Sequence, residues 1–193
     1  KLENMINKNT RMLIINYPNN PTGNILDKKI LEKIVGIAND NKVIIMSDEV
    51  YSDYSFNKFT SLHDYDYDNK IIISSFSKGP AMTGFRVGYA VSNTDIISKM
   101  VKLQAVALTS VAEPMQYAAL SALENNKLKE NVEIMKKRLS LISKRLKKMP
   151  VSFVEPEGAM YFFPRVELKG FNADQFTEKV LEQGLALTPG SGF

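Results

Sequence analysis

Cysteine is absent from this chain of 193 residues, and histidine occurs only once, at position 63. Without thiols the chain can form neither a disulfide framework nor a thiolate metal site, and one imidazole does not make a structural zinc site. No apolar run is long enough to span a bilayer, and the mainly polar first residues, KLEN, do not match the pattern of a signal peptide. We therefore expect a cytoplasmic protein without a metal site, in which His63 is a loop residue.

Acidic residues are slightly fewer than basic ones, which gives a formal net charge of +4. The excess is concentrated in two basic runs on one predicted helix, at residues 136–138 and 144–148. A solvated helix face explains such runs, so we expect neither a nucleic-acid partner nor a membrane partner. Hydrophobic residues make up 44% of the chain and charged residues 24%, which is ordinary for a globular protein with a core.

The stretch at residues 74–88, SSFSKGPAMTGFRVG, is the one around which the rest of the chain is organised. A predicted buried strand precedes it, and its glycines and proline make it an irregular loop. Three of its side chains can donate hydrogen bonds to a phosphate: Ser75, Ser77 and Arg86. Lys78 can bind an aldehyde covalently through its amine if its surroundings lower its pKa. Considered alone, however, a lysine in such a loop is most often merely solvated.

Two upstream segments change that interpretation, NNPTG at residues 19–23 and SDEVY at residues 47–51. Together with SFSKGPAMTGFRVGYA at residues 75–90, they resemble the fold-type I enzymes that use pyridoxal 5'-phosphate, and within these the class I/II aminotransferases. The three segments occur in the order and at the spacing of that family, and the resemblance runs from about Arg11 to the end of the chain. It implies that this chain corresponds to the C-terminal portion of such an enzyme, and that a further segment of the enzyme would follow residue 193.

Continuous apolar runs predict buried strands at residues 11–16, 43–46 and 71–73, and a further strand at residues 87–91. Between the first two, Asp27 can cap a helix that ends near residues 39–41. Strand, helix and strand with wholly apolar strands predict a parallel unit, whose ligands bind at the edge formed by the C-terminal strand ends. The groups that follow these strands should therefore converge there: Asp48, Tyr51 and Lys78.

The second half of the chain is predicted to contain helices followed by a segment with both strands and a helix. Helices are expected from Thr94 or Asp95, from Glu113, and over residues 127–149, where apolar residues form one seam. Strands are expected at residues 151–154, 160–163 and 185–188, around a helix at residues 173–183. Residues 17–23, which follow the first predicted strand, have the composition of a turn, and residues 52–69 are predicted to form a long loop.

The resemblance implies an α/β fold for the first part of the chain. Residues 1–120 would form part of the large pyridoxal-phosphate-binding domain of a fold-type I transferase, a mostly parallel sheet with flanking helices. Residues 121–193 would contain a long connecting helix and part of a smaller α+β C-terminal domain.

The resemblance also implies a role for each site residue. Asp48 would lie beside the pyridine nitrogen and keep it protonated, and Tyr51 and Asn20 would share hydrogen bonds with the ring 3-oxygen. Lys78 would carry the cofactor covalently and then transfer protons. The phosphate would bind three side chains: Ser75, Ser77 and Arg86. A cis Asn20–Pro21 bond is compatible with this turn, and Glu49 should point away from Asp48 in an extended segment.

The activity implied is a ping-pong transfer of an amino group between an amino acid and a 2-oxo acid, in a homodimer, with aspartate as the favoured substrate. The same catalytic set also serves β-lyases, decarboxylases and cyclopropane-forming synthases, and a non-enzymatic regulator can carry the same domain as a sensor. The arginine that usually receives the substrate α-carboxylate is expected beyond residue 193, and Arg165 is a poor match to it in motif terms.

Overall fold

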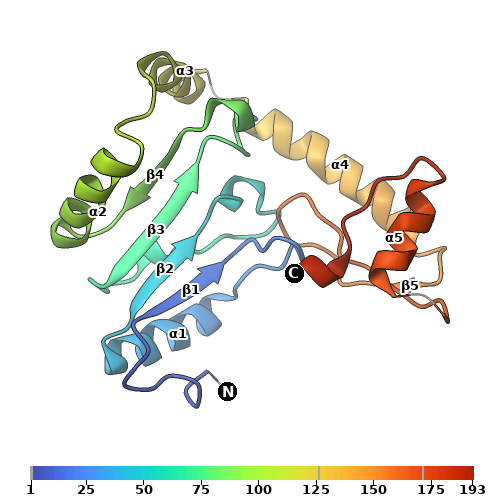
Figure 1. Cartoon of the computed structure of the whole chain (residues 1–193), viewed down its shortest axis with the longest axis horizontal. Coiled ribbons are helices and arrows are strands. Elements are labelled where there is room, and N and C mark those ends of the chain that lie inside the picture. Colours follow the sequence, from blue (N-terminus) through green and yellow to red (C-terminus); the bar gives the residue numbers. More distant parts are fainter. Residues whose placement is uncertain (1, 126, 171) are drawn as a thin grey trace.

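The computed structural model describes residues 2–125, 127–170 and 172–193. At its centre is a four-stranded sheet in the order β1 (Met12–Asn16), β2 (Ile44–Asp48), β3 (Lys70–Ser75) and β4 (Gly88–Val91) (Figure 1). The first three strands are parallel, and β4 runs antiparallel to β3. The sheet is therefore mostly parallel, as predicted, and each strand falls on one of the predicted apolar runs. The prediction that β1 is buried is wrong, because Met12 and Ile14 are exposed, whereas β2 and β3 each contain buried residues.

Parallel pairing aligns the C-terminal ends of the first three strands. Asn16 of β1 pairs with Asp48 of β2, which in turn pairs with Ile73 of β3. The segments that follow these strands consequently leave the sheet at one edge. Strand β4 begins with Gly88 opposite Ser75, so the loop between β3 and β4 starts and finishes at this same edge.

Helix α1 (Lys28–Asn41) connects β1 to β2 and supplies one side of the main core. Asp27 caps it as predicted, because its carboxylate accepts a hydrogen bond from the Lys29 N–H at 2.7 Å. The hydroxyl of Tyr67 donates to the Val43 carbonyl and lies 3.2 Å from the Ala38 carbonyl, which ties the predicted loop to the end of the helix. The buried core residues come from helix, strands and loop: Tyr17, Leu31, Ala38, Val43, Ile45, Leu62, Tyr67 and Ile72.

The first three of the four helices predicted in the second half are present, as α2 (Thr94–Ala107), α3 (Glu113–Glu124) and α4 (Leu128–Leu146), the last ending three residues earlier than predicted. Helix α4 leads from the neighbourhood of the sheet edge to the C-terminal segment that contains α5 (Ala173–Leu181) (Figure 1). Near its start, the Asn131 side-chain amide donates to the Gly79 carbonyl at 3.2 Å. The long helix therefore contacts the loop that carries Lys78.

The C-terminal segment differs from the prediction at all three of its predicted strands. The strand predicted at residues 151–154 is shortened to β5 (Val151–Ser152), which pairs with β6 (Arg165–Val166), a strand that was not predicted. The strand predicted at residues 160–163 is wrong, because its rings pack on separate partners instead of facing a neighbouring strand. Phe162 lies on Phe153 with 5.3 Å between ring centroids, and the corresponding distance from Phe163 to Phe193 is 5.9 Å.

The strand predicted at residues 185–188 is also wrong, since it has no ladder partner among the described residues. Helix α5 ends two residues earlier than predicted. Gly184 then adopts a φ of 83°, and the Leu185 N–H donates back to the Val180 carbonyl at 3.0 Å, which closes the helix end. The division of the chain into residues 1–120 and 121–193 stays a prediction.

Within the described ranges, no helix has the length and apolar character needed to cross a bilayer. The same ranges hold no group of three or more histidines and carboxylates placed to bind a metal ion.

Candidate active site

Three loops meet at the sheet edge formed by the ends of β1, β2 and β3. Asn20 lies in the turn after β1. Asp48 is the last residue of β2, and Tyr51 follows three positions later. Lys78 follows β3. The strand register places the start of these loops side by side, because Asn16, Asp48 and Ile73 are in register. The convergence predicted from the apolar runs is thus present in the fold.

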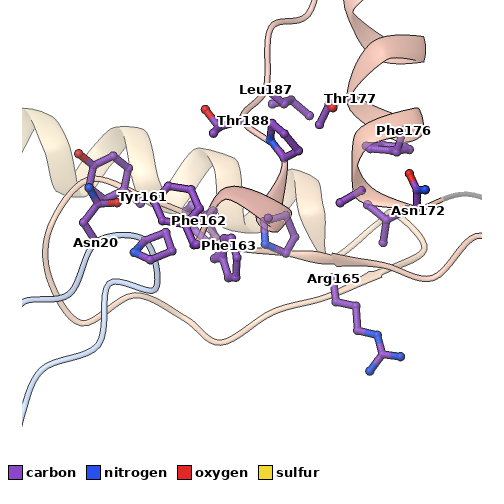
Figure 2. Close-up of a pocket in the computed structure, with 17 residues that line it drawn as sticks. Asn20, Tyr161, Phe162, Phe163, Arg165, Asn172, Phe176, Thr177, Leu187 and Thr188 are labelled. Carbon is purple, nitrogen blue, oxygen red and sulfur yellow. The ribbon is translucent and has the colours of Figure 1, made fainter.

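The turn after β1 is organised by the side chain of Asn16. Its Oδ1 atom accepts from the Asn20 N–H at 2.9 Å and from the Asn19 side-chain amide at 3.2 Å. The Asn20–Pro21 bond is cis, as the sequence allowed, and Tyr17–Pro18 is cis as well. These contacts place Asn20 at the end of a cavity that also contains Tyr161 (Figure 2).

The carboxylates of Asp48 and Glu49 accept hydrogen bonds from different sets of residues. One Asp48 oxygen accepts from the Val50 N–H at 3.2 Å, and the side chain is half-buried. Glu49 is buried and accepts hydrogen bonds from the Ser47, Ser61 and Tyr17 hydroxyls and the Leu62 N–H. The expectation that Glu49 turns away from Asp48 is therefore confirmed, and its partners belong to the core and the long loop.

The loop after β3 forms one wall of a cavity of about 990 Å³. Arg86 adopts a left-handed backbone conformation with a φ of 57°, and its guanidinium donates to the Thr83 carbonyl at 3.0 Å. The Ser75 hydroxyl accepts from the Ser77 N–H at 3.2 Å. The four side chains predicted for this loop all line the cavity: Ser75, Ser77, Lys78 and Arg86. Two hydroxyls, an ammonium and a guanidinium make a donor set whose chemistry fits a phosphate group.

Asn20, Asp48 and Tyr51 are not among the described residues that line the cavity containing Lys78. Tyr51 nevertheless touches the lysine, because the Lys78 Nζ atom lies 5.4 Å from the centroid of the Tyr51 ring. A cation over an aromatic face is an attractive contact. Tyr51 itself is buried.

Tyr161 is the residue at this edge that sequence reasoning did not find. Its hydroxyl makes a hydrogen bond with the Tyr51 hydroxyl, and the two rings meet edge to face with 5.5 Å between centroids. Burial and the hydrogen bond with Tyr51 raise the pKa of Tyr161 to about 12, and the Lys78 ammonium opposes that rise. The two tyrosines are 110 positions apart, and no motif or periodicity in the sequence indicates their contact.

The cavity that contains Asn20 and Tyr161 has a volume of about 800 Å³ and is largely apolar. Figure 2 shows Asn20 beside Tyr161 at one end of it, and Arg165 with its guanidinium directed away. Apart from Pro21, the remaining lining comes from the C-terminal segment and includes Phe162, Phe176, Leu187, Thr188 and Phe193. Arg165 is accordingly not oriented to receive an anion beside Tyr161.

Comparison with known proteins gives consistent matches along the chain. The family model described as aminotransferase class I and II matches residues 1–193. An aspartate aminotransferase of Pyrococcus horikoshii is 40% identical over 97% of this chain and 50% of its own length. The aromatic-amino-acid aminotransferase 2 of Thermococcus litoralis is 37% identical over 100% of this chain and 52% of its own length.

Among solved structures, the aspartate aminotransferase of Thermotoga maritima superposes with a TM-score of 0.93 at 39% identity. The superposition covers 98% of this chain and 51% of that one. This chain thus spans about half the length of the relatives that it matches.

Proposed function

We propose that this chain, which belongs to the class I and II aminotransferase family, carries the cofactor-binding lysine of an enzyme that transfers an amino group between an amino acid and a 2-oxo acid. The cofactor proposed is pyridoxal 5'-phosphate, with Lys78 as its covalent attachment point. The observation that supports this most directly is the contact of Lys78 with the Tyr51 ring, at the edge where β2 and β3 end. The loop hydroxyls and Arg86 supply a phosphate site beside the same lysine.

When bound, pyridoxal phosphate supplies an electron sink that stabilises negative charge developing at the substrate α-carbon. The residues of this chain would bind it and handle protons. Asp48, at the end of β2, would hold a proton on the ring nitrogen through its negative charge. Tyr51 and Asn20 would donate hydrogen bonds to the ring 3-oxygen. Lys78 would take a proton from the substrate α-carbon as a general base and return one as a general acid.

The amino donor, the kinetic order and the oligomeric state are part of the same proposal. Aspartate is the proposed amino donor, because the three motifs look most like the aspartate-type branch and several relatives carry that name. A relative named for aromatic amino acids has comparable identity, so the substrate is to be decided by assay. A ping-pong order and a homodimer accompany the proposal, and the cytoplasmic location stays a prediction.

The direct test is reductive trapping on the native full-length polypeptide that contains this chain. Borohydride treatment in the presence of pyridoxal phosphate should attach the cofactor to the peptide that carries Lys78, and the Lys78→Ala variant should show neither label nor turnover. Lys99→Ala, on the exposed surface of α2, is the matched control and should behave as wild type. A label on another lysine together with full turnover in Lys78→Ala would refute the assignment.

Product analysis separates transamination from the other reactions that the same residues can serve. With aspartate and 2-oxoglutarate, an aminotransferase produces glutamate, whereas a β-lyase releases ammonia and a decarboxylase releases carbon dioxide. A regulator would bind the cofactor at Lys78 and give none of these products. Glutamate formation that disappears in Lys78→Ala is the expected result.

A further inference from the structure

The contact between Tyr51 and Tyr161 is built by an interlocking pair of loops. The Gly23 carbonyl accepts from the N–H groups of Glu157 and Gly158, both at 2.9 Å. A side chain at Gly23 would place its Cβ 2.4 Å from the Cβ of Pro156, so only glycine permits this approach. The turn after β1 therefore holds the loop that leads into Tyr161, and it fixes the tyrosine against the sheet edge.

The two phenols have only two hydroxyl protons to distribute. Each phenol can donate one hydrogen bond and accept others. The Tyr51–Tyr161 bond uses one of the two protons, and the hydroxyl that does not donate in this bond keeps its proton for another acceptor. A negatively charged ring oxygen of the cofactor has no proton, so Tyr51 can serve it only as a donor.

We propose that Tyr161 is a positioning residue that donates its hydroxyl proton to the Tyr51 oxygen, so that the Tyr51 proton is directed to the cofactor 3-oxygen. This inference rests on the proposed function, because it concerns how the same site treats that oxygen. Tyr161 would not touch the cofactor in this arrangement. It would act through Tyr51, whose oxygen accepts one hydrogen bond while its proton makes another.

The surroundings of the pair agree with this direction of donation. Burial and the bond to Tyr51 keep Tyr161 protonated over the working pH range, since its pKa is raised to about 12. Lys78 lies over the ring of Tyr51, and the hydroxyl of the same tyrosine contacts Tyr161. Hydrogen bonds in a chain strengthen one another, and a phenol that accepts one becomes a better donor in the next.

The experiment is a pH titration of the visible band of the lysine-bound cofactor in the native full-length protein. A hydrogen bond to the 3-oxygen favours the deprotonated form of the lysine linkage and lowers the titration midpoint. Tyr161→Phe should raise the midpoint by about 0.5 pH unit, and Tyr51→Phe should raise it more. In the Tyr51→Phe background, Tyr161→Phe should add nothing, because the residue that transmits its effect is gone.

Two further variants sharpen the test. Tyr117→Phe removes an exposed phenol on α3 and should leave the midpoint unchanged. Replacement of Tyr161 by 3-fluorotyrosine strengthens the donor without removing the hydroxyl, so it should lower the midpoint. It also tests the inference if Tyr161→Phe does not fold.

Each outcome decides the matter. If Tyr161→Phe lowers the midpoint or leaves it unchanged while Tyr51→Phe raises it, Tyr161 does not donate to Tyr51 and the inference is overturned alone. If the wild-type protein shows no band bound to Lys78, the proposed function and the inference fail together. Equal shifts from Tyr161→Phe in both backgrounds would show that Tyr161 acts independently of Tyr51, which also overturns the inference.

Discussion

The buried carboxylate of Glu49 provides a sharp test of how this sheet edge is held together. It is 4% exposed and joins β2 to the loop over residues 52–69. Oε1 lies 2.9 Å from both the Ser47 Oγ atom and the Leu62 nitrogen, and Oε2 lies 2.7 Å from the Ser61 Oγ atom. Burial raises the pKa of Tyr17 above its ordinary range, so this phenol stays protonated and donates to Oε1 at 3.3 Å.

Replacing Glu49 by leucine should destabilise the protein strongly. A buried donor left without an acceptor costs about 1–3 kcal/mol, and three buried donors lose theirs: Tyr17, Ser47 and Leu62. Because the two hydroxyls can rotate toward other acceptors, we expect a loss of about 3–5 kcal/mol rather than the full sum. Glu49→Gln keeps one oxygen, and the Ser61 hydroxyl can accept from the new amide, so its loss should be about 1–2 kcal/mol.

The assay is urea unfolding of the native full-length protein, combined with hydrogen exchange across residues 52–69. The matched controls are Glu32→Gln and Glu32→Leu on the exposed surface of α1, which should change the free energy of unfolding by less than about 0.5 kcal/mol. Faster exchange at the Leu62 amide in Glu49→Leu is the local signature. If Glu49→Leu is no less stable than Glu32→Leu, the carboxylate does not hold this loop and the reasoning is refuted.

Three other substitutions test the site. Asp48→Asn should still bind pyridoxal phosphate but lose most turnover, with Asp48→Glu retaining more; equal turnover of the asparagine variant and wild type contradicts the assigned role. Arg86→Ala should weaken cofactor binding by about 1.5–3 kcal/mol in equilibrium dialysis, and unchanged affinity removes Arg86 from the site. Gly79→Ala would place a Cβ 2.0 Å from the Asp53 carboxylate, so we expect a loss of about 1–3 kcal/mol in thermal unfolding that shrinks in an Asp53→Ala background.

The sheet was predictable because its strands are short apolar runs that end at polar or turn-forming residues. The runs at residues 43–46 and 71–73 have no polar alternation, and this pattern is typical of parallel strands. The cap at Asp27 was predictable for a local reason, since its acceptor reaches the Lys29 N–H two positions along the chain. The family resemblance drawn from three short motifs is confirmed by the match over residues 1–193.

The C-terminal segment was harder to predict because an apolar run indicates burial and not the partner. Residues 160–163 are apolar and aromatic, and they are used for separate ring contacts and one hydroxyl contact instead of a strand. Tyr161 could not be assigned to the site, since its position depends on hydrogen bonds between the loop that precedes it and the distant turn at Gly23. Local patterns determine elements, whereas such long-range contacts depend on the assembled fold.

The surroundings of Lys78 therefore depend on distant parts of the chain as well as on its own motif. Helix α4 contributes Asn131, which binds the carbonyl of Gly79 directly after the lysine. The C-terminal segment contributes Tyr161, which binds the hydroxyl of Tyr51 beneath the lysine. Two separate contacts from residues beyond position 120 thus reach direct neighbours of Lys78, namely Gly79 in the sequence and Tyr51 in space. A displacement of α4 and the C-terminal segment relative to the sheet would strain both contacts at once, so the position of this lysine is coupled to the packing of those segments.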